Sequence, residues 1–217
     1  MNSPIIVTGV PRSGTSLTCG VLNTLGAFGG DMRGPTDWNQ KGMFENRRIV
    51  GLVKDYLRSI DCDPLAQHPL PALSDLRPWP TLQNDIEQAM RADGYEGGVW
   101  FFKTVKGCHL WPLFMQAFPL AHWIIVERPK EQVIDSLLRT PFMRAYNTRE
   151  GWDQYIEVHK KRFAEIERNG LDVVRINSNR IINGDYTYIR RFAKRVGLEW
   201  DEDVVREFVE PSLWSVA

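Results

Sequence analysis

The chain is poor in cysteine, with three in 217 residues, and it has no Asn-x-Ser/Thr sequon. Cys19, Cys62 and Cys108 form no close pair of the kind that binds a metal, so the sequence predicts no metal site. An odd number of cysteines without a sequon favours a reducing, cytoplasmic setting. The N-terminal segment lacks a basic flank and its apolar stretch is interrupted, so we expect no signal peptide.

The chain also has no excess of positive or of negative charge. Lys and Arg number 27, Asp and Glu also number 27, and the formal net charge is therefore zero. This balance excludes non-specific electrostatic binding of nucleic acid by the whole surface, although a local basic pocket is still possible. No apolar run is long enough to span a bilayer, so no membrane partner is expected. Nothing in the sequence indicates an oligomeric state.

The remaining composition is that of a globular protein, with 43% hydrophobic and 25% charged residues and no internal repeat. At roughly 150 residues per domain we expect one domain over residues 1–217. Short apolar runs alternate with amphipathic stretches, which predicts an α/β fold with a central parallel sheet flanked by helices, similar to that of P-loop NTPases. The expected strands, which we predict to be covered on both faces, are 4–8, 99–103, 122–127 and 172–176. The expected helices are 14–25, 43–60, 129–139, one around 152–166 and 185–197, with loops at 29–42 and 61–80.

A glycine-containing loop follows the first expected strand directly and leads into a helix. Its sequence is Gly9-Val10-Pro11-Arg12-Ser13-Gly14-Thr15-Ser16. In such a loop, backbone N–H groups converge on an anion and the helix N-terminus adds partial positive charge. The spacing matches the nucleotide-binding form G-x-x-x-x-G-K-[ST], except that Thr15 replaces the lysine and the nearest cation is Arg12. A turn without a ligand is the alternative interpretation.

The stretch from Pro11 to Ser16 resembles the 5′-phosphosulfate loop of the sulfotransferases that use 3′-phosphoadenylyl sulfate (PAPS). The resemblance implies that Pro11, Arg12, Ser13, Gly14, Thr15 and Ser16 bind the 5′-phosphate and the sulfuryl group. It also places Arg12 near the bridging oxygen that must leave. Because PAPS has no γ-phosphate, the missing lysine is consistent with this family.

A second stretch resembles the 3′-phosphate site of the same family. Arg128 ends the expected strand 122–127, and Ser136 follows eight residues later on the next helix. Ser136 falls off the apolar stripe of that helix and can donate to a ligand, while the forked guanidinium of Arg128 suits a phosphate. A surface arginine with a helix-edge serine remains the alternative.

Several residues are candidates for the acid–base chemistry of sulfuryl transfer. The cytosolic steroid- and phenol-type members carry a histidine two residues after a lysine, whereas this chain has Lys103-Thr104-Val105, so it resembles the bacterial-type branches more closely. Other branches of the family use a glutamate downstream of the first loop, and this resemblance makes Glu45 the candidate base. Glu45 is expected on the inward face at the start of helix 43–60, where partial desolvation should raise its pKa. The alternative is that Glu45 only complements the helix dipole. His109 is a substitute candidate, with a structural role as its alternative.

Lys103, at a strand end, either neutralises sulfuryl oxygens or is a snorkelling edge residue. These residues together predict in-line sulfuryl transfer from PAPS to a hydroxyl or amine of a small-molecule or glycan acceptor, without a metal. Two alternatives stay open. One is a P-loop small-molecule kinase in which Glu127 holds magnesium, and the other is a nucleotide-binding protein without catalytic activity.

Overall fold

The structure is a computed structural model in which residues 1–214 are described. Its centre is a parallel sheet of four strands in the order β2-β1-β3-β4. These are β1 (Ile5–Gly9), β2 (Phe101–Lys103), β3 (His122–Glu127) and β4 (Asp172–Asn177). The predicted α/β fold with a central parallel sheet is confirmed, and each predicted strand overlaps an observed one.

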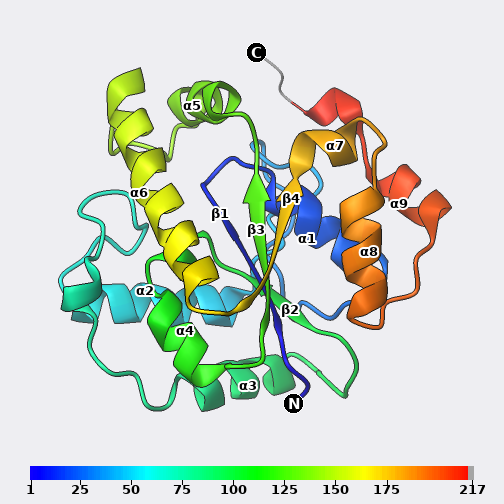
Figure 1. Ribbon diagram of the computed structural model, residues 1–217, viewed down its shortest axis with the longest axis horizontal. Helices are drawn as coiled ribbons and strands as arrows, with labels where there is room; N and C mark the ends of the chain where they lie inside the picture. The colour runs from blue at the N-terminus through cyan, green and yellow to red at the C-terminus, as the bar shows by residue number, and fades with distance from the viewer. Residues whose placement is uncertain (215–217) are drawn as a thin grey trace.

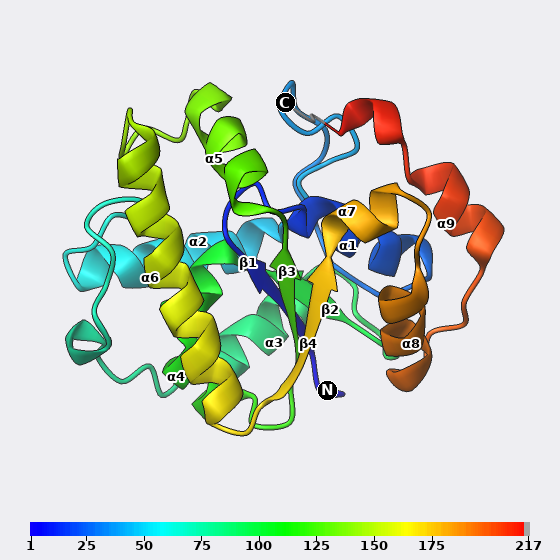
Figure 2. The same ribbon diagram turned by 45° about the horizontal axis from the view of Figure 1, so that its top comes forward.

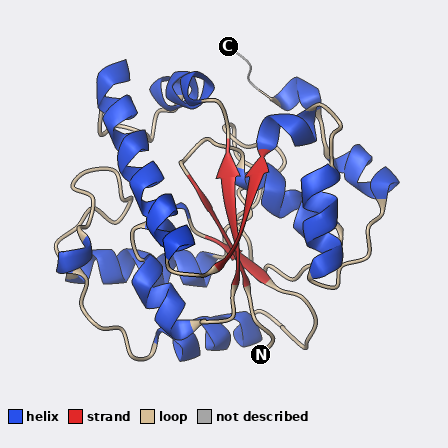
Figure 3. Cartoon of the chain, in the orientation of Figure 1, coloured by secondary structure: helices blue, strands red, loops and turns tan. Residues whose placement is uncertain are grey.

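Helices cover both faces of the sheet, as Figure 3 shows. On one face lie α2 (Arg47–Ser59), α3 (Leu82–Ala92), α4 (Trp111–Ala117), α5 (Lys130–Arg139) and α6 (Arg149–Arg168). On the other face lie α1 (Thr15–Thr24), α7 (Ser178–Ile182), α8 (Thr187–Arg195) and α9 (Glu202–Phe208). Short 3-10 turns are η1 (Leu73–Asp75), η2 (Val105–Cys108) and η3 (Pro211–Leu213). None of the helices formed by residues 1–214 has the length and apolar character needed to cross a membrane.

Alternating side chains of the strands divide the core into two layers. Ile6 of β1 packs with the helices of the first face, whereas Ile5 and Val7 pack with those of the second. The prediction that all strands are covered on both faces is wrong for β4. It lies at the edge of the sheet, and its Arg175 is exposed and ion-paired with Glu127 and Glu167.

Some helix boundaries differ from the predicted ones for identifiable reasons. The helix predicted over 43–60 begins only at Arg47, because the side chain of Asn46 accepts the N–H of Ile49 and caps it. Glu45 therefore precedes the helix. Helices α3, α4, α7 and α9 were not predicted, since all four have eleven residues or fewer and offer little periodic pattern.

The order of the parallel strands has a topological switch point between β1 and β3, at the centre of the sheet. The chain leaves β1 for β2 on one side and later adds β3 on the other side of β1. In open parallel sheets, ligands bind outside the carboxyl ends of the strands at such a point. The predicted phosphate loop follows β1 and Arg128 follows β3, so both lie at this position. Figures 1 and 2 show α5 and α7 at the end of the sheet to which β3 and β4 point.

Candidate functional site

A cavity of about 550 Å³ opens at the carboxyl edge of the sheet. This volume lies within the range of about 300–1,000 Å³ that is usual for ligand sites. Its walls come from the loop after β1, the segment 33–45, the ends of β2 and α5, and the C-terminal segment. Eight of the lining side chains are Lys or Arg and three are Asp or Glu. In a chain with no net charge, this local excess of positive charge favours an anionic ligand.

The loop after β1 has a backbone suited to holding an anion. Arg12 has a φ of 72° and Gly14 a φ of 99°, so both lie in the left-handed region. A Cβ on Gly14 would lie 2.5 Å from the Cβ of Ser178 and 2.8 Å from the ring of Trp214, so only glycine fits there. Helix α1 begins at Thr15, and the N–H groups of its first turn have no acceptor inside the helix. These N–H groups lie beside the cavity, in the arrangement that binds phosphate groups elsewhere.

The predicted loop residues are brought together, with one exception. Pro11, Arg12, Gly14, Thr15 and Ser16 line the cavity. Ser13 is buried below the loop, and its carbonyl accepts the hydroxyl of Ser178 at 2.7 Å. Ser13 therefore does not line the cavity, and it is its backbone, not its side chain, that bonds to Ser178.

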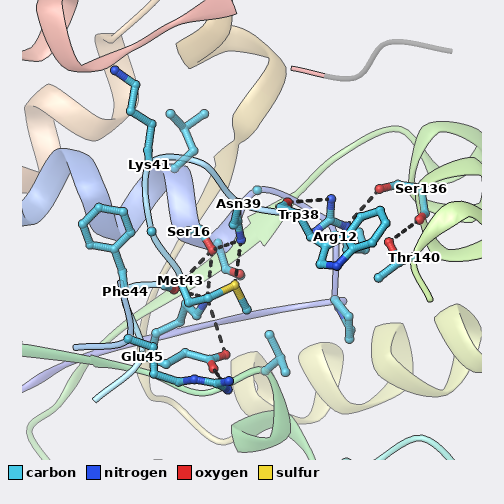
Figure 4. A pocket seen from close by; sticks show the side chains of 18 of the residues that line it. Arg12, Ser16, Trp38, Asn39, Lys41, Met43, Phe44, Glu45, Ser136 and Thr140 are labelled. Atoms are coloured by element: carbon cyan, nitrogen blue, oxygen red, sulfur yellow. Dashed lines mark hydrogen bonds and ion pairs between the residues drawn. The ribbon is translucent and has the colours of Figure 1, made fainter. Parts of the chain in front are cut away.

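The two predicted phosphate anchors lie in contact with each other. The Nε of Arg12 donates to the Oγ of Ser136 at 3.0 Å, and its terminal nitrogen donates to the carbonyl of Trp38 at 3.4 Å (Figure 4). A terminal nitrogen of Arg128 donates to the carbonyl of Arg12 at 3.4 Å. These two hydrogen bonds join residues that are 124 and 116 positions apart in the sequence.

Arg128 is held in place by an aromatic ring and an amide. Its guanidinium lies 4.2 Å from the ring of Trp214, and its Nε donates to Gln132 at 3.0 Å. Burial, together with the charges of Arg12 and Arg139, lowers the pKa of Arg128 to about 10. The three guanidinium groups of Arg12, Arg128 and Arg139 concentrate positive charge at this end of the cavity, which favours an anionic ligand.

Glu45 and Lys103 form a second charged cluster beside the loop. Lys103 is only 3% exposed, and its ammonium donates to the Oγ of Ser16 at 2.9 Å and to the carbonyl of Met43 at 2.5 Å. It also lies 3.5 Å from Glu45, which Arg33 approaches at 3.7 Å. The interpretation of Lys103 as a snorkelling edge residue is therefore wrong, because its charge points inward to the loop.

The expected rise of the Glu45 pKa is also wrong. Burial alone would raise it, but the charges of Lys103, Lys106 and Arg33, with a hydrogen bond from Lys103, lower the pKa below its usual value. The sequence pattern indicated that Glu45 is partly buried, but it did not indicate that the positive charges of Lys103 and Lys106 lie near the carboxylate. Glu45 lies before the first helical turn of α2, so the helix-dipole interpretation does not describe its position either.

His109 does not line the cavity. It lies between η2 and α4 with no exposed surface, and its Nε2 is 3.2 Å from the Nε2 of His159. Burial, followed by the charges of His159 and Arg162, lowers its pKa well below the usual value. A base for an acceptor in the cavity would need contact with that acceptor, which His109 does not have.

Among residues 1–214, Cys108, His109 and His159 form the one group of potential metal ligands, with ligand atoms within 4.8 Å of one another. Their contacts are those of a hydrogen-bonded core. The Nδ1 of His159 lies 2.8 Å from the carbonyl of Tyr155, which leaves its Nε2 to accept from His109. Burial raises the pKa of the Cys108 thiol, which opposes the thiolate form that a metal requires.

Some lining residues had no motif by which the sequence could reveal them. Arg139 lies three residues after Ser136, Lys106 lies near Glu45, and Lys54 lies near Lys106. Trp214 lies far along the chain from the arginine that it covers. Trp38, in the loop predicted over 29–42, also lines the cavity. Glu127 of the kinase alternative does not line the cavity and is ion-paired with Arg175.

Comparison with known proteins gives matches among solved structures. No model of a known protein family matches the chain, and no curated protein matches it in sequence. The sulfotransferase domain of the Synechococcus PCC 7002 olefin synthase superposes with a TM-score of 0.59 and 13% identity, covering 98% of this chain and 86% of that one. Sulfotransferase STF1 of Mycobacterium tuberculosis H37Rv superposes with a TM-score of 0.54 and 14% identity, covering 96% of this chain and 71% of that one. Sulfotransferase STF9 of Mycobacterium avium superposes with a TM-score of 0.56 and 16% identity, covering 95% of this chain and 67% of that one. Over nearly its whole length, this chain therefore has the P-loop-like fold of bacterial sulfotransferases.

Proposed function

We propose that the chain is a PAPS-dependent sulfotransferase that moves a sulfuryl group to a hydroxyl or amine of a small acceptor. The observation that carries the proposal is the contact between the two anion anchors. Arg12 of the loop bonds directly to Ser136, and Arg128 bonds to the backbone of Arg12. A donor with a 5′-phosphosulfate and a 3′-phosphate needs two anion sites on one nucleotide, and this arrangement provides them next to each other.

The residues of the loop fit the charged end of such a donor. The positive φ values at Arg12 and Gly14 turn the loop so that amides of α1 lie beside the cavity. Arg12 is placed by Ser136 and the carbonyl of Trp38, and it would stabilise the charge that develops on the leaving oxygen. Lys103 would neutralise sulfuryl oxygens from the opposite side, next to Ser16. PAPS would supply the sulfuryl group and leave as adenosine 3′,5′-bisphosphate.

Glu45 is the group that would accept the proton of the attacking hydroxyl or amine. Its carboxylate lines the cavity 3.5 Å from the ammonium of Lys103, which also donates to Ser16 of the loop, and this supports a position next to the transferred group. Its lowered pKa keeps it ionised at neutral pH, which makes it available as an acceptor at the cost of some basicity. As the acceptor oxygen forms its bond to sulfur, the bridging S–O bond breaks and the acceptor proton passes to Glu45.

A direct test measures turnover with each donor. The protein is incubated with PAPS and a panel of alcohols, phenols and amines, and release of adenosine 3′,5′-bisphosphate is followed by chromatography. We expect acceptor-dependent release that is lost in Arg12→Ala. Phosphorylation of the same panel from ATP with magnesium, without release from PAPS, would instead establish the kinase alternative.

A further inference from the structure

Part of the cavity is lined by residues to which the proposal above gives no role in donor binding. We call this part the acceptor lobe. It lies between α2, η2, the segment 61–80 and the connection from α5 to α6. Its walls are formed by Val50, Lys54, Leu65, Gln67, Val105, Lys106, Thr140, Phe142 and Met143.

Two lysines in the acceptor lobe have no protein partner. Throughout residues 1–214, no hydrogen bond or ion pair joins the ammonium group of Lys54 or of Lys106 to another residue. By contrast, two other lysines that line the cavity are paired, Lys41 with Glu210 and Lys103 with Glu45. Partly buried cations without partners are costly, so a pair of them next to a cavity indicates an anion that binds between them.

The acidic groups near these lysines are already engaged. Glu45 is shared by Lys103 and Arg33. The carboxylate of Asp63 accepts the backbone N–H groups of Leu65, Gln67 and His68 at 2.9–3.2 Å, and so is bound within its own loop. Burial, with the charges of Lys54 and Lys103, lowers the pKa of Lys106, even though Glu45 and Asp63 act in the opposite direction. The lobe therefore keeps a surplus of positive charge.

The rest of the lobe is apolar. Leu65 and Phe142 are 45% and 39% exposed, and both line this part of the cavity. Large side chains exposed together at a cavity suit an apolar ligand. Gln67 fixes this wall, because its amide donates to the carbonyl of Phe142 and accepts the N–H groups of Arg144 and Ala145.

Resting on the sulfotransferase function proposed above, we propose that the acceptor is an anionic amphiphile. Its carboxylate, sulfate or phosphate lies between Lys54 and Lys106, its reactive hydroxyl or amine lies next to Glu45, and its apolar body lies against Leu65 and Phe142. Neutral alcohols of the same size are then poor acceptors.

This arrangement also changes the basicity of Glu45. Lys106 is one of the charges that lower the Glu45 pKa. An acceptor anion next to Lys106 offsets that charge, so the Glu45 pKa rises when the acceptor binds. The anionic group thus orients the acceptor and strengthens the base that it meets.

The test measures binding, so it does not depend on the unidentified acceptor. Hexanoate, octanoate, decanoate and octyl sulfate are titrated by calorimetry into protein saturated with adenosine 3′,5′-bisphosphate, beside the primary amides of the three acids. We expect the anions to bind at least about tenfold more tightly than the amides, since charge-assisted contacts have that strength. Comparing the affinity for octyl sulfate with that for octanoate shows whether the site prefers a sulfate or a carboxylate.

Substitutions then locate the anion. Lys54→Met and Lys106→Met keep the apolar stem of the side chain and remove its charge, and together they should abolish the preference for anions over amides. The control is Lys161→Met, an exposed lysine on α6 outside the cavity, which should leave the preference unchanged. The affinity of each of these variants for adenosine 3′,5′-bisphosphate should stay within twofold of the wild-type value.

Three results would overturn the inference: equal affinity for anions and amides, no binding of either series, or an unchanged preference in the double variant. A large loss of nucleotide affinity in that variant would assign the two lysines to the donor and overturn it as well. If wild-type protein does not bind the nucleotide, the proposed function itself fails, and the titrations without nucleotide still report on the lobe.

Discussion

Replacing Glu45 by Gln separates its chemical role from its structural one. Gln keeps the shape of the side chain and can still accept from Lys103, but it cannot take a proton at neutral pH. General acid–base catalysis contributes typically 10²–10⁴-fold, so turnover should fall by about that factor with nucleotide affinity little altered.

The structure also sets the cost in stability. Lys103 keeps its hydrogen bonds to Ser16 and Met43 after the change, but it loses a carboxylate 3.5 Å away in a buried position. We expect a loss of about 1–3 kcal/mol, below the cost of stranding a buried charge completely. For a chain of this size, each 1 kcal/mol lowers the melting temperature by about 2–4 °C.

The assay combines rate and stability measurements. Initial rates are taken well below the melting temperature of the variant, with circular dichroism to verify the fold. Glu127→Gln is the matched control, because it removes a carboxylate at the carboxyl edge of β3 whose ion pair with Arg175 is exposed and contributes about 0–1 kcal/mol. A folded Glu45→Gln protein with wild-type turnover would refute the assignment of Glu45 as the base, and so would an equally large loss of turnover in Glu127→Gln.

Three further predictions address other residues. Arg128→Ala should weaken binding of adenosine 3′,5′-bisphosphate by about tenfold or more in calorimetry and leave adenosine 5′-phosphosulfate, which has no 3′-phosphate, nearly unchanged; equal losses would make Arg128 structural. Gly14→Ala should abolish binding of both nucleotides, since the new Cβ meets Ser178 and Trp214 at a φ of 99°, and retained affinity would contradict the described loop. Lys106→Met removes a charge that lowers the Glu45 pKa, so the acid limb of the rate profile should move to higher pH, and an unmoved limb would separate Lys106 from Glu45.

The sequence predicted the sheet because strands depend on local patterns, and it also pointed to the loop after β1 and to Arg128 with Ser136, whose role in binding anions stays a prediction. Short apolar runs become strands, and a glycine loop between a strand and a helix binds anions in many folds. Arg128 and Ser136 could be paired because they lie on consecutive elements, a strand end and the helix that follows.

What the sequence could not supply were contacts between distant segments. The pKa of Glu45 depends on Lys103 and Lys106, which lie in a different element, so the predicted direction was wrong. Burial of His109 against His159 required knowledge of the packing of α6. The start of α2 depended on a single capping residue, Asn46, which is a local signal that was available but outweighed by the apolar stripe.

The central claim is that the two anchors bind one nucleotide with phosphates at both its 3′ and 5′ positions. Thermal denaturation with adenosine 3′,5′-bisphosphate, with AMP and with magnesium-ATP tests it most directly. At a hundredfold excess over the dissociation constant, the bisphosphate should stabilise the protein by about 2.7 kcal/mol, which corresponds to a rise of about 5–11 °C, with clearly smaller shifts for the other two. Equal or greater stabilisation by magnesium-ATP, or no response to the bisphosphate, would contradict the account.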